Sequence, residues 1–272
     1  MRIAIVGAGY AGLAAAWHLR KKHAITVFDG GVGASHVSTG LLHPAPGRKA
    51  LPTWKAQEGM ESALELLEAA GRHTHLRNGI VRFLSGQRQM IPEGVTVFSK
   101  LYLAGLKKAC SGVVYVQHWV SRLEELADFD QIVLTTGAET LSWASLPLKK
   151  TIGQCLVCRC DEPIPVSLLG QGHITPTEEE GICLVGSTYE HTERPDPQKA
   201  LQLIDQVAQF YPPAKTFRVL DILSGTRISP KVGYKPLMQK IDATTWALTG
   251  FGSRGLIYHA LFGKWLASCL PI

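Results

Sequence analysis

The sequence predicts an α/β fold in which a mainly parallel, doubly wound sheet is joined to a smaller α+β region. Three observations support this prediction. The first 29 residues follow the order strand, glycine turn, helix, strand, which is the βαβ unit of a doubly wound sheet. The chain closes on a similar strand, glycine-rich turn and helix over residues 246–266. Between these regions, residues 148–220 contain short apolar stretches interrupted by prolines, a pattern that fits a separate covering layer.

The N-terminal unit consists of three segments. Arg2–Val6 is a short, mostly apolar run of the kind found in strands buried on both faces. Ala11–Arg20 is rich in alanine, so a helix there can pack closely on a sheet. Ile25–Phe28 supplies the second strand. These segments predict the first half of a Rossmann-type domain.

The later elements are predicted from composition and periodicity. Residues 30–50 contain five glycines and two prolines, so we expect a long ordered loop there. The spacing of Met60, Leu64 and Leu67 predicts a helix over Glu58–Arg72. The other predicted elements are strands at Val113–Val116, Gln131–Leu134, Gln154–Cys158, Ile182–Val185 and Trp246–Thr249, and helices at Pro197–Phe210 and Leu256–Leu266.

These elements divide the chain into two predicted parts. We expect residues 1–50, 95–147 and 221–272 to form the Rossmann-type nucleotide-binding domain. Residues 51–94 and 148–220 are expected to form the smaller α+β substrate or covering domain.

Composition places the chain among globular proteins. It has 272 residues, of which 46% are hydrophobic, enough for a sizeable core. The net charge of +6 permits an acidic partner such as a nucleic acid, but the 28 basic residues are scattered. The six cysteines do not form a regular disulfide framework, so we expect a cytoplasmic protein. No uninterrupted apolar stretch is long enough to predict a membrane span.

The glycine turn after the first strand carries the clearest functional signal. Gly7, Gly9 and Gly12 let backbone N–H groups approach a pyrophosphate at the start of a helix, where the helix dipole stabilises negative charge. Asp29 ends the second strand, where a carboxylate accepts hydrogen bonds from a ribose and disfavours a 2′-phosphate. A tight turn without a ligand is the less favoured interpretation. NAD and FAD share this pattern, and NADP fits it poorly.

Two later segments favour FAD. Gln131–Gly137 (QIVLTTG) and Leu248–Leu256 (LTGFGSRGL) are both strands that lead into turns of small residues. The second turn opens a helix whose N-terminus can face a flavin or its pyrophosphate. FAD binding therefore requires the first and last segments of the chain to meet.

These segments resemble the D-amino acid oxidase-like flavoprotein superfamily, which includes glycine and sarcosine oxidases and oxidises C–N bonds with FAD. The similar pieces are RIAIVGAGYAGLAAAWHL, VFD, IVLTTGA, IGQCLV, GTRISPKVGYKPLM and GFGSRGL. They are spread thinly over most of the chain, which is shorter than typical single-chain amine oxidases of this class. The resemblance implies FAD contacts by Gly7, Ala8, Gly9, Tyr10, Ala11, Gly12, Asp29, Gly30, Ala34, Ser35, Thr39, Gly40, Leu41, Val120, Thr136, Gly137, Gly252, Ser253, Arg254, Gly255 and Leu256.

One branch of this superfamily is similar in finer detail. Gly33-Ala34-Ser35, residues 39–44 (TGLLHP), GSTYE at 186–190 and GSRGL at 252–256 resemble the oxidase domain of the bifunctional bacterial enzyme that makes 5-methylaminomethyl-2-thiouridine in tRNA. This resemblance implies that the substrate is a modified tRNA whose wobble uridine carries a carboxymethylaminomethyl group. The chain has no methyltransferase domain, so a separate methyltransferase would act downstream.

The resemblance also implies the residues of the substrate site. Arg227 occupies the position of the carboxylate-binding arginine, and its alternative role is a solvated or ion-paired side chain. Arg254 is expected to touch FAD or guide the substrate, and Tyr189 to donate a hydrogen bond from the covering domain. The chain departs from the family at Lys231, where an acid is common, and at Asp29, where glutamate is commoner.

Two alternatives stay open. Either the substrate is a free small amino acid such as glycine, sarcosine or a D-amino acid, or the protein binds FAD or RNA without catalysis. We expect no metal site, because Cys155, Cys158 and Cys160 lack a fourth ligand in a segment that alternates as a strand.

Overall fold

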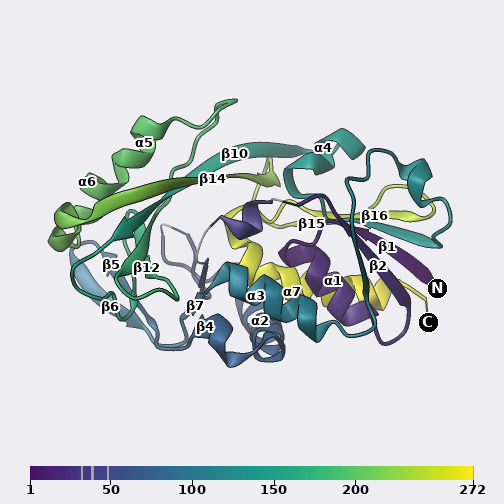
Figure 1. Cartoon of the computed structure of the whole chain (residues 1–272), viewed down its shortest axis with the longest axis horizontal. Coiled ribbons are helices and arrows are strands. Elements are labelled where there is room, and N and C mark those ends of the chain that lie inside the picture. The colour runs from purple at the N-terminus through teal and green to yellow at the C-terminus, as the bar shows by residue number, and fades with distance from the viewer. Residues whose placement is uncertain (32, 38–39, 48, 272) are drawn as a thin grey trace.

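The first of three sheets is the expected doubly wound one. The computed structural model describes residues 1–31, 33–37, 40–47 and 49–271. This sheet has the order β15-β16-β9-β1-β2-β8, and only β15 is antiparallel to its neighbour (Figure 1). Its strands are β1 (Arg2–Val6), β2 (Ala24–Asp29), β8 (Val114–Gln117), β9 (Gln131–Leu134), β15 (Leu237–Lys240) and β16 (Thr245–Thr249).

Strand β1 lies at the point where the strand order reverses, between β2 and β9. Ile3 and Ala4 point to opposite faces of this strand and both are fully buried, so both faces are covered. The carboxyl end of a strand at such a switch point is the usual ligand-binding position of an open α/β sheet. Here that end leads directly into Gly7.

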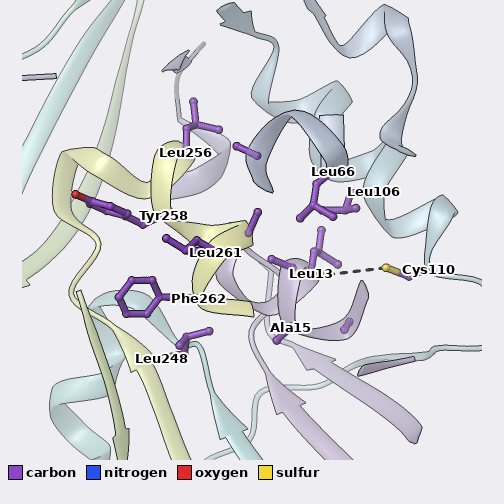
Figure 2. Close-up of a cluster of buried hydrophobic side chains, with 14 of the residues drawn as sticks. Leu13, Ala15, Leu66, Leu106, Cys110, Leu248, Leu256, Tyr258, Leu261 and Phe262 are labelled. Atoms are coloured by element: carbon purple, nitrogen blue, oxygen red, sulfur yellow. Dashed lines mark hydrogen bonds between the residues drawn. The ribbon is translucent and has the colours of Figure 1, made fainter. Parts of the chain in front are cut away.

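Four helices pack together with this sheet: α1 (Tyr10–Leu19), α2 (Ala56–Ala70), α3 (Ser99–Ala109) and α7 (Gly255–Cys269). Figure 2 shows Leu261 and Phe262 of α7 beside Leu13 and Ala15 of α1. The two helices approach closely at Gly263, where a Cβ would lie 2.8 Å from the carbonyl carbon of Ala14. The first and last helices of the chain therefore share one core.

The second sheet has the order β14-β10-β13-β12-β11-β5-β6. Its longest strands, β10 and β14, pair over their whole lengths and extend across the top of Figure 1 toward the first sheet. The strands are β5 (Ile80–Leu84), β6 (Gln87–Ile91), β10 (Leu148–Arg159), β11 (Ser167–Leu169), β12 (His173–Pro176), β13 (Ile182–Gly186) and β14 (Arg218–Pro230).

The two faces of the second sheet differ in character. Leu156, Val185 and Ile174 lie side by side on neighbouring strands and are buried with the helices α5 (Pro197–Leu201) and α6 (Leu203–Ala208). The next lateral row, on the opposite face, contains Cys155, Gly186 and His173. Because alternate residues of a strand point to opposite faces, these three residues face away from α5 and α6.

A small third sheet and several short helices complete the described structure. The sheet has the order β3-β7-β4 and joins the long loop to the middle of the chain. Its strands are β3 (Gly40–Leu42), β4 (His75–Leu76) and β7 (Val95–Val97). The short helices are η1 (Ala34–His36), η2 (Arg72–Thr74), η3 (Leu123–Leu126), η4 (Gly137–Glu139), α4 (Thr140–Trp143), η5 (Pro212–Thr216) and η6 (Gly252–Arg254).

The α/β fold class and most predicted elements are confirmed. The strand at Gln131–Leu134 has the predicted bounds, and the first and last helices are shifted by only a few residues. The long loop at 30–50 was predicted without regular structure, but it contains η1 and β3. The predicted helix Pro197–Phe210 is divided into α5 and α6 at Gln202.

Two features differ from the expected division of the chain. Strand β14 pairs with β10 in the second sheet, although residues from 221 onward were assigned to the nucleotide-binding domain. Helix α2 packs in the core of the first domain, although residues 51–94 were assigned to the covering domain. Pairing and packing join segments that are far apart in sequence, which composition alone does not show. No helix in the described part of the chain is long and apolar enough to cross a membrane.

Candidate functional site

The turn after β1 has the shape that a pyrophosphate cradle requires. Gly7 has a φ of +102°, and a Cβ there would lie 2.7 Å from the carbonyl oxygen of Thr135. A Cβ on Gly12 would overlap the carbonyl oxygen of Gly7. Any larger residue at these two positions would push the turn away from β9 or the helix away from the turn. The glycines thus allow the backbone to pass close to a ligand at the helix start.

Two side chains from outside the turn hold its backbone. The Ala8 N–H donates to Asp29 Oδ1 at 2.8 Å, and the Tyr10 N–H donates to Ser35 Oγ at 3.3 Å. Asp29 is therefore at the end of β2 and beside the turn, as the ribose-binding role requires. The neighbouring Gly30 packs against the ring of Trp119, which leaves no room for a Cβ.

The closing turn reaches the same region. A Cβ on Gly40 would overlap Leu256 Cδ1, and the Cβ position of Gly255 lies 3.6 Å from the Tyr10 ring. The Tyr10 hydroxyl also donates a short hydrogen bond to Ser99 at the start of α3. The expected meeting of the first and last segments of the chain is therefore present.

The other predicted FAD contacts have varied surroundings. Ala11 is in the first turn of α1, Ala34 lies in η1, Leu41 in β3 and Gly137 in η4 with a φ of +56°. Val120 is buried in a cluster with Phe28 at the end of β2, and Ser253 is exposed in η6. Thr136 immediately precedes η4, and Gly252, next to Ser253, has a φ of +53°. Thr39 lies outside the described residues.

Arg227 lies between two elements of the nucleotide-binding side. Gly225, Arg227 and Ser229 are every second residue of β14 and therefore share one face of the strand. A Cβ on Gly225 would lie 2.9 Å from Val37 Cγ2, just after η1, and the Cβ position of Gly252 in η6 lies 3.2 Å from Ser229 Cβ. The side chain of Arg227 is thus on the face of β14 that meets the Rossmann-type domain.

The guanidinium of Arg227 is only partly satisfied. Its Nη2 donates to Ser187 Oγ at 2.9 Å, and its Cζ lies 4.9 Å from the centroid of the Tyr189 ring. Nη1 is buried and has no hydrogen-bond partner among the described residues, and the described ion pairs do not include Arg227. A buried N–H without an acceptor is costly, and a carboxylate ligand would remove that cost.

A buried carboxylate holds the segment that carries Ser187 and Tyr189. Glu190 Oε1 accepts hydrogen bonds from Thr188 Oγ1 at 2.5 Å and from Gln154 Nε2 at 2.8 Å, and Oε2 accepts from the Asp196 N–H at 2.9 Å. Burial by itself would raise the pKa of Glu190, but these hydrogen bonds outweigh it and lower the pKa below its usual value. This network fixes the loop against β10.

Sequence reasoning missed three residues around Arg227. The guanidinium passes directly over Gly153, which has no side chain to displace it. A Cβ on Gly186 would lie 2.6 Å from the His173 ring and 2.8 Å from Cys155 Sγ, so these two side chains meet above that glycine. No motif marks His173, because its place beside Cys155 comes from strand pairing. Gly153 lies within the IGQCLV segment, but its contact with Arg227 depends on the register of β10 and β14.

His173 is a neutral base at ordinary pH. Burial, and then the positive charge of Arg227, lower the pKa of its imidazole to about 4. Its Nε2 is buried and unpartnered among the described residues. Burial also raises the pKa of the Cys155 thiol to about 11, so this thiol is protonated. Of Arg227, His173 and Cys155, only Arg227 is therefore charged at ordinary pH.

Arg254 is the residue before α7 and lies beside an exposed tyrosine. Its Cζ is 4.1 Å from the centroid of the Tyr234 ring, and its Nη2 is 3.8 Å from the Cβ position of Gly47. Its Nε is buried without a partner among the described residues. Lys231, which departs from the family pattern, is exposed in the turn after β14. Arg254 therefore connects the closing turn to the segment that carries Tyr234 and to the loop at Gly47.

A family model described as FAD dependent oxidoreductase (DAO) matches residues 2–91 and 88–269. The chain belongs to this family. Its cofactor is FAD, and the glycine turn, Asp29 and the adjoining closing turn fit that nucleotide. A comparison with curated proteins finds no match.

Solved structures of low sequence identity share the fold of this DAO-family chain. Iminodiacetate oxidase from Chelativorans sp. BNC1 aligns at 18% identity over 98% of this chain and 94% of its own, with a TM-score of 0.82. Glycine oxidase from Geobacillus kaustophilus aligns at 17% identity over the same shares, with a TM-score of 0.80. Fructosamine oxidase from Aspergillus fumigatus aligns at 13% identity over 99% and 87%, with a TM-score of 0.78.

Proposed function

We propose that this protein oxidises the C–N bond of an N-substituted glycine. The observation that supports this proposal is that Nη1 of Arg227 is buried and has no partner in the described part of the chain, next to an Nη2 that donates to Ser187. A guanidinium with a free N–H matches the geometry of a carboxylate, and Arg227 lies on the face of β14 that meets the FAD-binding elements. This arrangement fits a substrate that has a carboxylate one carbon away from its amine.

The residues of the chain orient the substrate and control its protonation. FAD supplies the chemistry of the oxidation, because a bound flavin accepts a hydride from the carbon beside the nitrogen. Arg227 holds the carboxylate, while Ser187 and Tyr189 keep the guanidinium in place. The neutral imidazole of His173 can accept a hydrogen bond near the amine. Hydrolysis of the resulting imine yields glyoxylate and the free amine.

We further propose that the amine belongs to the carboxymethylaminomethyl wobble uridine of tRNA. The support is the resemblance of GAS, TGLLHP, GSTYE and GSRGL to the tRNA-modifying branch, together with two exposed tyrosines that contact the arginines Arg227 and Arg254. Tyr189 is 59% exposed and Tyr234 is 68% exposed, each in contact with an arginine of the site. An exposed aromatic rim admits a nucleoside on a macromolecule more readily than a closed pocket does.

A free small amino acid is the second proposed substrate class. The structural neighbours named as iminodiacetate and glycine oxidases favour it. Both are proteins whose named substrates carry a carboxylate beside an amine, which Arg227 would also bind.

Anaerobic titration of the purified, FAD-loaded protein separates these proposals. Bleaching of the flavin by tRNA bearing the carboxymethylaminomethyl uridine, with release of glyoxylate, is the expected result. Bleaching only by glycine, sarcosine or iminodiacetate would replace tRNA with the free amino acid class. Absence of bleaching by every substrate, with FAD bound, would contradict oxidation and favour a non-catalytic flavoprotein.

A further inference from the structure

Two exposed aromatic rings alternate with cations next to the proposed substrate site. Lys235 Nζ lies 4.7 Å from a ring centroid of Trp54. Lys55 Nζ lies 5.8 Å from a ring centroid of the same tryptophan. The Arg254 guanidinium lies against the ring of Tyr234. We refer to Trp54, Lys55, Tyr234 and Lys235 as the aromatic–cation surface. It joins segments from before α2 and from the turn between β14 and β15.

The surface is continuous with the site through Arg254. This arginine touches Tyr234, and its own short helix η6 meets Ser229 of β14, two residues from Arg227. Tyr234 and Lys235 are adjacent in sequence, and Lys235 contacts the Trp54 ring, so Tyr234 and Trp54 are linked through this lysine. The chain of contacts from Arg227 to the aromatic–cation surface thus runs through Ser229, η6, Arg254 and Tyr234.

The aromatic–cation surface is held on a rigid support. The Tyr258 hydroxyl donates to the backbone oxygen of Trp54 at 2.8 Å and lies 2.7 Å from Thr53 Oγ1. The Trp54 ring packs edge-on against Trp265, with ring centroids 5.7 Å apart. Tyr258 and Trp265 both belong to α7, the helix that the closing turn begins. Trp54 is thus positioned by the same helix that positions Arg254.

Charge and chemistry identify the occupant. Lys55, Lys235 and Arg254 each lie against an aromatic ring or next to one. Among the described ion pairs, the only one that includes any of these three cations joins Lys55 to Glu58 at 2.5 Å. Flat rings that stack with bases, interleaved with cations that meet phosphates, are the features by which proteins bind single-stranded nucleic acid. An acidic peptide would contact the cations alone, whereas a nucleic acid would also contact the exposed faces of the Tyr234 and Trp54 rings.

We propose that the aromatic–cation surface binds the anticodon-loop nucleotides that flank the target nucleoside of tRNA. This proposal rests on the proposed tRNA substrate and adds to it the residues that recognise the RNA. Tyr234 and Trp54 stack with unpaired bases, and Lys235 and Lys55 neutralise the neighbouring phosphates. The target nucleoside is then directed past Arg254 toward Arg227.

The test measures RNA binding separately from oxidation. Fluorescence anisotropy of a labelled anticodon stem-loop is followed with the FAD-loaded full chain and with Tyr234→Ala, Lys235→Gln and the double variant. Lys108→Gln, on the exposed face of α3, is the matched lysine control. We expect Tyr234→Ala to weaken binding about tenfold, since loss of one base stack costs roughly that much or more, and the double variant to weaken it further. Lys235→Gln should also lower the salt dependence by about one ion.

The outcomes distinguish the two proposals. If modified tRNA bleaches the flavin but the test variants bind the stem-loop as tightly as the Lys108→Gln control, the aromatic–cation surface is refuted while the proposed function stands. If the protein binds the stem-loop no more tightly than a duplex of equal charge, recognition of unpaired bases is refuted. If only free amino acids bleach the flavin, the tRNA substrate is refuted. A change of sedimentation coefficient in the variants would show that a second copy of the chain occupies this surface, which also overturns the proposal.

Discussion

Gly153→Ala tests whether the position of Arg227 determines carboxylate binding. The added Cβ would lie 2.5 Å from Arg227 Cζ and 3.0 Å from Nη1, which is closer than real contacts, so the guanidinium must shift by roughly 1 Å. That shift breaks the 2.9 Å hydrogen bond to Ser187. A misplacement of this size costs on the order of 100-fold in kcat/KM. Stability should not fall, because alanine is favoured over glycine within a strand by about 0.5–1 kcal/mol.

The measurement pairs flavin reduction with a binding assay that needs no turnover. Stopped-flow reduction gives kcat/KM, and titration with a small carboxylate, followed through the flavin spectrum, gives the dissociation constant of the carboxylate. Both should worsen in Gly153→Ala while the melting temperature is kept or raised. In an Arg227→Ala background, the same substitution should add little, because its target is gone. Unchanged carboxylate affinity in the single variant would refute the role of Arg227.

The remaining predictions concern the cradle, the buried loop and two histidines. Gly12→Ala should give protein that binds FAD at least about tenfold more weakly, since its Cβ would overlap the Gly7 carbonyl; a normal flavin content after dialysis would contradict this. The stability that Glu190 contributes is complete above its unfolded pKa and is lost as pH falls through its lowered folded pKa. Glu190→Gln should therefore destabilise the protein at pH 7 and weaken the pH dependence of urea unfolding below pH 5, and parallel curves for both proteins would rule this out. The free His173 imidazole, with its pKa near 4, should leave no ionisation near pH 6.5 in the kcat/KM profile; a shoulder there that disappears in His173→Gln would disprove its neutrality. Tyr102→Phe removes the 2.6 Å hydrogen bond between the Tyr102 hydroxyl and His259 Nε2, and we expect a loss of about 1–3 kcal/mol in the free energy of unfolding, which equal denaturation midpoints would contradict.

The sequence predicted the nucleotide-binding side well because its signals are local. The turn from Gly7 to Gly12 and the acid at the end of β2 have fixed spacing within one βαβ unit, and the structure brings Asp29 to the Ala8 N–H. Helix α3 was missed although its buried residues Tyr102, Leu103 and Leu106 recur at helical spacing. Strand β14 was missed as an element because its residues are of mixed polarity and largely half-exposed.

The surroundings of Arg227 lay beyond sequence reasoning for a related reason. Arg227 itself was identified by resemblance, but Gly153, His173 and Cys155 come from strands that pair across large sequence separations. Their proximity depends on the register of β10 with β14 and of β10 with β13. No local pattern encodes that register, since a side chain's neighbours across a sheet belong to other segments.

This dependence on register links the packing of β14 to the candidate site. Gly225 and Ser229 contact the nucleotide-binding side and Arg227 lies between them on the same face of β14, whereas the intervening Ile228 is buried in a separate apolar cluster with Leu148. A slip of one residue would exchange these two sets, placing Ile228 against η6 and Arg227 among Leu146, Leu148 and Ala247. An unpaired guanidinium in that cluster would cost several kcal/mol. The same alternation that buries Ile228 therefore holds Arg227 toward the FAD side, so the packing of this strand and the orientation of its proposed substrate-binding residue are set by one physical constraint.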